Sequence, residues 1–250
     1  GDHKVIAEVS FPTALTTLHE KAIYLHDARQ YQVERFDYDG RKAYVRRVDS
    51  DYFTDAIDYT QVKILAEYES TGMNGAEILH GDVRVNTQVV GFKKVKFFTL
   101  ENVGSGRLSM PEQEMHTTSF WLHFPAEFLG RFPDLPAADR QSGMAALGTA
   151  LRSVAALLLM CDPHDLGVAI TEDVAPGAFE PNLYLYDSYP GGAGQSAPLF
   201  RLAPELLRKT LQLIEGCGCD HGCPSCTGPI GEIGERGKEA ASRFLVAMCA

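Results

Sequence analysis

The sequence has no excess of positive charge. Its 23 Lys and Arg are outnumbered by 33 Asp and Glu, which gives a net charge of −10 and a pI of about 5.3. A protein that binds nucleic acid by itself is normally basic, because its affinity comes largely from neutralising phosphates. The charge balance therefore argues against strong DNA binding by this chain alone, although a local basic strip could contribute within a larger assembly.

Signals for export and membrane insertion are also lacking. Residues 1–10 do not combine a positively charged start with an apolar run. The longest apolar stretch, 154–161, is far shorter than the roughly 20 residues that a membrane-spanning helix needs. We therefore expect a soluble, cytoplasmic protein. Because the chain starts with Gly rather than Met, we expect it to be a fragment of a longer protein.

The first half of the chain has the pattern of a β-rich region. Short runs of aromatic and β-branched residues are separated by turn residues, and Asp39-Gly40 favours a type I′ hairpin turn. A Pro-containing stretch at 132–136 then marks a boundary. The predicted strands are 22–25, 31–36, 43–48, 61–68, 83–90, 92–99 and 117–124.

The second half changes to a helical period. An apolar stripe recurs at steps of three and four residues and predicts a long helix. Its members are Met144, Leu147, Leu151, Val154 and Leu158. Further helices are predicted at 204–214 and 235–248, and strands at 168–171 and 182–187. The expected fold class is α+β, with a β-rich N-terminal subdomain at 1–131 followed by an α/β subdomain at 137–250 that contains a four-cysteine zinc knuckle.

Four cysteines lie within ten residues between the last two predicted helices. They are Cys217, Cys219, Cys223 and Cys226. The glycines at 218, 222 and 228 allow the sharp turns that would bring the four thiols onto one tetrahedral ion. The spacing therefore predicts a metal site, with structural Zn²⁺ favoured. Since protein ligands would fill all four positions, no activated water could bind, and the metal would join two helices rather than catalyse a reaction.

Other roles for these cysteines stay open. Two disulfides are conceivable, but the lack of an export signal indicates a reducing compartment. An iron–sulfur cluster also takes four thiolates. His221 could replace one ligand, although we expect it to face solvent. We expect Cys161 and Cys249 to be buried free thiols.

A glycine-rich loop follows the strand predicted at 182–187. Asp187 is followed by Gly191, Gly192 and Gly194, whose N–H groups could bind a phosphate. The order of the glycines matches neither dinucleotide-binding nor Walker A loops, so tight-turn packing is favoured over anion binding.

A hydrolase site is a less favoured alternative. Asp162, His164 and Asp165, together with Asp187, offer carboxylates and an imidazole for acid–base chemistry or for a metal. We prefer the interpretation that Asp162 and its neighbouring Pro end one helix and cap the next segment, which leaves the chain without a catalytic residue.

Two basic clusters are candidate contacts for single-stranded DNA. Lys93, Lys94 and Lys96 alternate with aromatic residues, and strand alternation predicts that Phe92, Lys94, Lys96 and Phe98 share one face. The second cluster surrounds the predicted hairpin turn and contains Arg41, Lys42, Arg46 and Arg47. Such residues can follow a phosphate backbone and stack on bases. A solvated sheet face is the commoner explanation of either cluster.

Three separated motifs resemble the MrfA-type zinc-binding domain, which closes the C-terminus of a group of DEAD/DEAH-box superfamily 2 DNA helicases. They lie at 160–167 (MCDPHDLG), 184–194 (YLYDSYPGGAG) and 222–226 (GCPSC). Segments at 22–26, 31–34, 43–45 and 51–54 are similar to the region that precedes the domain there. The likeness thus spans nearly the whole chain.

The resemblance implies that Cys217, Cys219, Cys223 and Cys226 bind zinc. It also implies a longer ATP-dependent helicase that acts in DNA repair, of which this chain is a non-catalytic accessory region that braces the motor and could guide single-stranded DNA. No phosphate-binding loop of a motor is recognisable here. A related branch acts in phage defence with the domain on a separate protein, so the motor is expected in cis or, alternatively, in trans.

Overall fold

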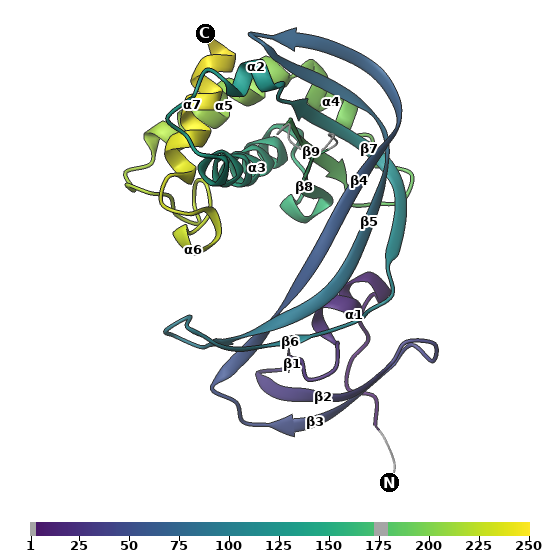
Figure 1. Cartoon of the computed structure of the whole chain (residues 1–250). Coiled ribbons are helices and arrows are strands. Elements are labelled where there is room, and N and C mark those ends of the chain that lie inside the picture. Colours follow the sequence, from purple (N-terminus) through teal and green to yellow (C-terminus); the bar gives the residue numbers. More distant parts are fainter. Residues whose placement is uncertain (1–3, 173–179) are drawn as a thin grey trace. The chain divides into compact units, whose positions relative to one another are not determined.

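The computed structural model describes residues 4–172 and 180–250, which form two compact units (Figure 1). The first unit comprises Gly1–Thr60 and Asn86–Gln113, and the second comprises Gln61–Val85 and Glu114–Ala250. Two long strands, β4 (Tyr52–Met73) and β5 (Ala76–Lys96), contribute residues to both units. This grouping differs from the predicted division at 132–136, which rests on a change in sequence period and stays a prediction.

The first unit contains one helix and a small antiparallel sheet. Helix α1 (Phe11–Thr17) precedes strands β1 (Ile23–His26), β2 (Arg29–Asp37) and β3 (Lys42–Val48), which pair in that order. These strands confirm three of the predicted runs. Strand β6 (Asn102–Arg107), which was not predicted, pairs antiparallel with the end of β5.

The turn between β2 and β3 differs from the predicted type I′ turn. Of its residues, Arg41 has a positive φ of 49°, whereas Asp39 and Gly40 do not. The N–H of Gly40 donates to the carboxylate of Asp37 at 2.8 Å, and a Cβ at Gly40 would lie 2.6 Å from that carboxylate. The position therefore favours glycine because a side chain there would displace the Asp37 carboxylate, not because it needs a positive φ.

A six-stranded sheet has the order β4-β5-β7-β9-β8, with β6 attached to β5. Strands β7 (Gln113–His123), β8 (Leu166–Glu172) and β9 (Pro181–Asp187) pair antiparallel, with Trp121 opposite Tyr184. Strand β7 precedes the predicted boundary and β9 follows it. One sheet therefore unites strands that the sequence analysis assigned to two subdomains.

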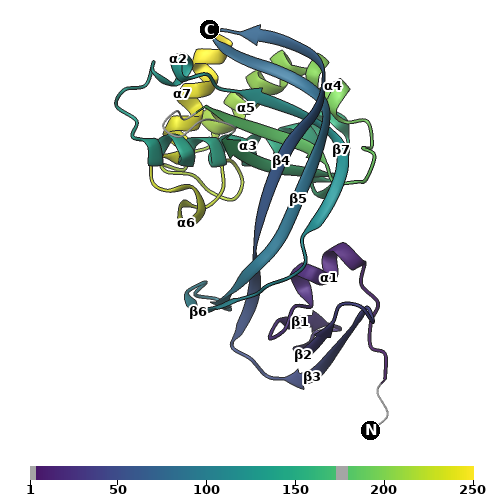
Figure 2. The ribbon, with the colours of Figure 1, turned by 45° about the vertical axis from the view of Figure 1, so that its right-hand side comes forward.

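Three long helices of the second unit pack against one another beside this sheet (Figure 2). They are α3 (Ala137–Leu159), α5 (Ala203–Gly216) and α7 (Gly237–Cys249), accompanied by the short α2 (Ala126–Leu129), η1 (Pro163–Asp165), α4 (Ser196–Arg201) and α6 (Ile230–Ile233). The predicted stripe on α3 is confirmed, because Met144, Leu147 and Leu151 are fully buried. A Cβ at Gly143 would lie 2.6 Å from the Cβ of Ala240, so α3 and α7 approach closely. The fold class is thus α+β, as expected.

Helix α3 is also long and apolar enough, by length and composition alone, to cross a membrane. The apolar run noted in the sequence, 154–161, is shorter than the apolar part of this helix, because small residues continue the apolar character toward the helix start. A single such helix is weak grounds for a membrane span, since the core helix of a globular domain has the same composition. Here ten residues of α3 are buried, and seven of them belong to the main hydrophobic core of the second unit.

Candidate metal centre

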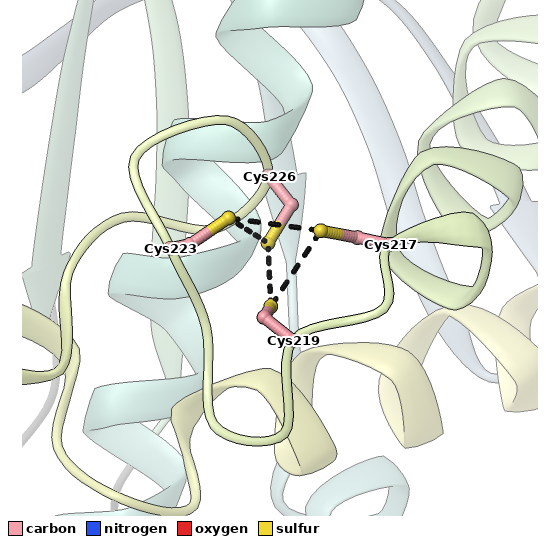
Figure 3. A group of neighbouring side chains, drawn as sticks. All are labelled: Cys217, Cys219, Cys223 and Cys226. Atoms are coloured by element: carbon pink, nitrogen blue, oxygen red, sulfur yellow. Dashed lines mark hydrogen bonds between the residues drawn. The ribbon is translucent and has the colours of Figure 1, made fainter.

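The four cysteines converge between α5 and α7. Cys217 follows α5 directly, and the other three lie in the loop before α6. Figure 3 shows the four side chains pointing toward one another. All four sulfurs lie within 4.8 Å of each other, and within the described part of the chain no other set of three or more His, Cys, Asp or Glu converges in this way.

The sulfur separations fit one tetrahedral zinc ion. Four of the Sγ–Sγ distances are 3.5, 3.6, 3.6 and 3.7 Å. Four sulfurs at about 2.3 Å from a tetrahedral ion would be separated by about 3.8 Å, whereas a disulfide needs about 2.05 Å. All six cysteines are free. The cage has room for one ion but not for several iron and sulfide atoms, which favours zinc over an iron–sulfur cluster.

The thiols do not ionise equally in the absence of a cation. The backbone of Cys219 favours the thiolate of Cys217, but hydrogen bonds with the neighbouring cysteine side chains raise the pKa of Cys217 to about 11. Burial opposes ionisation of Cys226, yet the Thr227 hydroxyl, the Cys223 backbone and the adjacent thiols lower its pKa to about 6. Because like charges this close repel, the cage can hold four thiolates only around a cation.

Two glycines shape the loop around the sulfurs. Gly222 and Gly228 have φ values of +118° and +98°, which side-chain-bearing residues rarely adopt. A Cβ at Gly222 would lie 2.6 Å from Cδ1 of Ile233, so the loop also needs glycine for space. Gly218 does not have a positive φ, and a Cβ there would contact nothing within 4 Å. The loop therefore does not use the conformational freedom that was predicted for this glycine.

Lys238 on α7 contacts the cage, which the sequence analysis missed. Its ammonium donates to the carbonyl oxygen of Cys217 at 2.8 Å, to that of Cys219, and to Sγ of Cys219 at 3.4 Å. A zinc ion with four thiolates carries a charge of −2, which a neighbouring cation partly offsets. No spacing rule would have found this residue, because packing of α7 brings it to the loop.

Replacing Lys238 with Met should weaken zinc binding about tenfold, because the thiolates lose their neighbouring positive charge while the aliphatic stem is kept. A competition titration with a chromogenic chelator would measure the change. Lys209 of α5 is the matched control, since it pairs with Glu205 at 3.6 Å and touches no sulfur. Equal zinc affinity in Lys238→Met and Lys209→Met would show that the contact has no electrostatic role.

His221, the alternative ligand, and the other two cysteines, Cys161 and Cys249, lie outside the cage. His221 is exposed, and its Nδ1 lies 3.1 Å from the carbonyl oxygen of Glu235. Cys161 is half-buried after the end of α3. Cys249 is exposed at the end of α7, so the expectation that it is buried was wrong. It sits in the last turn, where the apolar face of α7 ends.

The glycine-rich loop folds around the carboxylate of Asp187. Oδ2 accepts the N–H groups of Ala193, Gly194 and Gln195 at 2.6, 2.9 and 3.2 Å, and the hydroxyl of Thr118 at 3.1 Å. The Asp187 side chain is fully buried. The φ values of Gly191, Gly192 and Gly194 are +82°, +77° and +86°. The amides that a phosphate would need thus donate to Asp187, which favours the tight-turn interpretation.

Two of the carboxylates proposed for a hydrolase, Asp162 and Asp165, accept hydrogen bonds from neighbouring groups of the protein. The N–H of His164 donates to Oδ1 of Asp162 at 2.8 Å, and the N–H of Asp162 donates to Oδ2 of Asp165 at 3.1 Å, which forms a capping box on η1. The Tyr189 hydroxyl donates to Asp165 at 2.7 Å. These contacts are those of a helix cap, and they give no support to the hydrolase alternative.

The predicted DNA contacts lie in the first unit. That unit has 12 Lys and Arg against 13 Asp and Glu, whereas the second has 11 against 20. The acidity of the chain therefore resides mainly in the second unit. Arg46 pairs with Glu34 at 2.7 Å, the Arg41 guanidinium lies 4.9 Å from the centre of the Phe11 ring, and Lys42 and Arg47 are exposed.

The predicted common face at 92–98 is wrong. Phe92 is buried and stacks on His19 with 4.9 Å between ring centres, while Phe98 is fully exposed. The β5–β6 register skips Val103 of β6 between the pairs Lys94–Gly104 and Val95–Asn102, so the irregularity lies in β6. Strand β5 then ends at Lys96, so Phe98 belongs to the following turn.

These features define a mixed α and β chain with a closed four-cysteine centre typical of structural zinc. Residues 147–227, which include all four cysteines, match the model of the family "MrfA Zn-binding domain". This segment of the chain is thus similar to the MrfA Zn-binding domain.

Comparison with known proteins extends this likeness to nearly the whole chain. The chain is 38% identical to "Uncharacterized ATP-dependent helicase YprA" of Bacillus subtilis, over 97% of its own length and 32% of the relative's. It is 24% identical to "ATP-dependent helicase HRQ1" of Saccharomyces cerevisiae, over 90% of its length and 22% of the relative's. The crystal structure of the DUF1998 helicase MrfA bound to DNA matches with 37% identity and a TM-score of 0.67, over 98% of this chain and 32% of that one. The chain therefore spans a third or less of these relatives.

Proposed function

We propose that the chain is a non-catalytic accessory region of a cytoplasmic ATP-dependent DNA helicase that acts in DNA repair. Its four cysteines would hold a structural zinc ion that joins the end of α5 to α7. The observation that carries the proposal is the closed cage of four sulfurs at zinc-like separations inside the segment that matches the MrfA Zn-binding domain. A filled tetrahedron has no open position for catalysis.

Motor domains in cis are the preferred partner, because the relatives are helicases about three times the length of this chain or more. A motor acting in trans, as in a phage-defence system, is the alternative. A motor sequence in the same reading frame upstream of this chain would favour the first, and its absence would favour the second.

An apolar groove beside the metal centre supports the bracing role. It is lined in part by Leu157 and Leu158 of α3, Leu213 of α5 and Ser225 of the cysteine loop. Leu157 is 79% exposed, and the adjoining Met160 is 92% exposed. Exposed apolar surface next to a rigid metal loop suits a contact with another domain. We assign this groove to the motor.

Changing Leu157 to Asp in the motor-containing protein should lower DNA unwinding about tenfold, because a charge would oppose docking of the apolar surface. Zinc content and thermal stability should not change, since the side chain is exposed. A gel-based unwinding assay measures the effect. Leu65→Asp is the control, at a residue of β4 that is 47% exposed and distant in sequence. Wild-type unwinding by Leu157→Asp would rule out this docking surface.

A further inference from the structure

The turn between β5 and β6, residues 97–101, is held in a defined shape. The N–H of Lys96 donates to the carbonyl oxygen of Glu101 at 2.9 Å, and the N–H of Leu100 donates to that of Lys96 at 3.2 Å. Phe97 packs on Phe53 with 5.5 Å between ring centres. Phe97 therefore anchors the turn to its own unit, whereas the next residue, Phe98, is exposed.

Two bulky residues of this turn are exposed in an unfavourable backbone conformation. Phe98 and Leu100 have φ values of 63° and 57°. Side-chain-bearing residues rarely adopt this left-handed region, and a bulky one there is often associated with function. Phe98 is 103% exposed and Leu100 is 69% exposed, and Val103 of β6 adds a further 48% exposed side chain. The turn thus presents a small apolar tip, at the end of β5 in Figure 1.

The strand that leads into this tip is basic. Lys93 is exposed, the Lys94 ammonium lies 5.1 Å from the centre of the Tyr52 ring, and Lys96 has a loose pair with Glu101 at 4.0 Å. An exposed ion pair at this distance is weak and would yield to a phosphate. An exposed aromatic ring beside several lysines is the combination that binds single-stranded nucleic acid, because the ring stacks on a base while the ammonium groups contact phosphates.

We propose that the β5–β6 turn is a contact site for single-stranded DNA in which the Phe98 ring stacks on a base and Lys94 and Lys96, which lie on one face of β5, contact flanking phosphates. The inference rests on the proposed function, which it deepens by assigning the DNA contact to particular residues. The proposed contact thus lies at the exposed tip of the turn, and not on the common face of residues 92–98 that the sequence predicted.

Fluorescence anisotropy with the zinc-loaded chain and a labelled oligothymidylate of about 20 nucleotides tests the site at about 50 mM salt. Phe98→Ala should weaken binding about tenfold with an unchanged salt dependence, and Phe98→Trp should restore it. Phe98→Gly should weaken binding equally while it relieves the backbone, which guards against a folding defect. Lys94→Ala with Lys96→Ala should reduce the salt slope by about 1.4, because each lost phosphate contact to a single strand lowers it by about 0.7. Leu25→Ala, at a residue of β1 that is 54% exposed, should bind as the wild type.

The possible failures are distinguishable. Wild-type affinity in both Phe98→Ala and Phe98→Gly would overturn the stacking site while DNA guidance by another surface stands. If those variants instead lost unwinding only in the motor-containing protein, the tip would contact the motor and the proposal would fall. If the wild-type chain did not bind the oligonucleotide at low salt, both this site and the DNA-guiding role would be wrong, whereas zinc content and the docking groove are tested separately.

Discussion

Cys223→Ser is expected to lose the bound metal and to lower the melting temperature of the chain by about 10 °C. The reason is that metal-binding energy at a closed site is folding energy, and a few kcal/mol shift a domain of this size by roughly that amount. Elemental analysis should find one zinc per wild-type chain, and differential scanning calorimetry measures the shift. A strong chelator should destabilise the wild type in the same way and leave Cys223→Ser unaffected.

Cys249→Ser is the matched control for this experiment, because Cys249 is an exposed thiol outside the cage. It should keep both the zinc and the melting temperature. Iron in the purified protein, or no metal at all, would overturn the site assignment. An unchanged melting temperature in Cys223→Ser would refute the stabilising role even if zinc were present.

Asp187→Ala should strongly destabilise the chain. It would remove the fully buried carboxylate that accepts three partly buried N–H groups and the Thr118 hydroxyl, and each lost hydrogen bond to a charged group costs about 1.5–3 kcal/mol at most. We expect the free energy of unfolding to fall by about 3 kcal/mol or more, as measured by urea denaturation. Asp187→Asn keeps a carbonyl oxygen as acceptor and should lose less.

Asp162→Ala provides the comparison, because it removes only the cap of the short η1 and should cost about 1 kcal/mol. If Asp187→Ala were no more destabilising than Asp162→Ala, the loop would not depend on its internal carboxylate. The amides at 193–195 would then be candidates for an external anion after all.

The cysteine cage and most strands could be predicted because their signals are local. Ligands within ten residues define the site by spacing, and the alternation of β2 or the stripe of α3 requires no knowledge of distant contacts. Lys238 could not be found in this way, since it reaches Cys219 only through the packing of α7. The same limit applies to the pairing of β7 with β9, which joins strands that are about sixty residues apart.

The error at 92–98 has a different cause. Strand β5 ends at Lys96, so the alternation on which the predicted face rested stops before Phe98. Phe92 and Phe98 look equivalent in the sequence, yet one is buried in the first unit and the other is exposed on a turn. In this segment the departure from regular structure produces the candidate DNA contact.

The short span of the cage has a consequence for biosynthesis. All four sulfurs come from ten consecutive residues, so closing the loop around an ion costs little chain entropy. The segment can therefore capture its ion once Cys226 has left the ribosomal exit tunnel, before α7 has emerged from it. The metal-bound loop then presents two carbonyl oxygens and a thiolate as acceptors for Lys238. Metal binding thereby fixes the acceptors against which α7 packs.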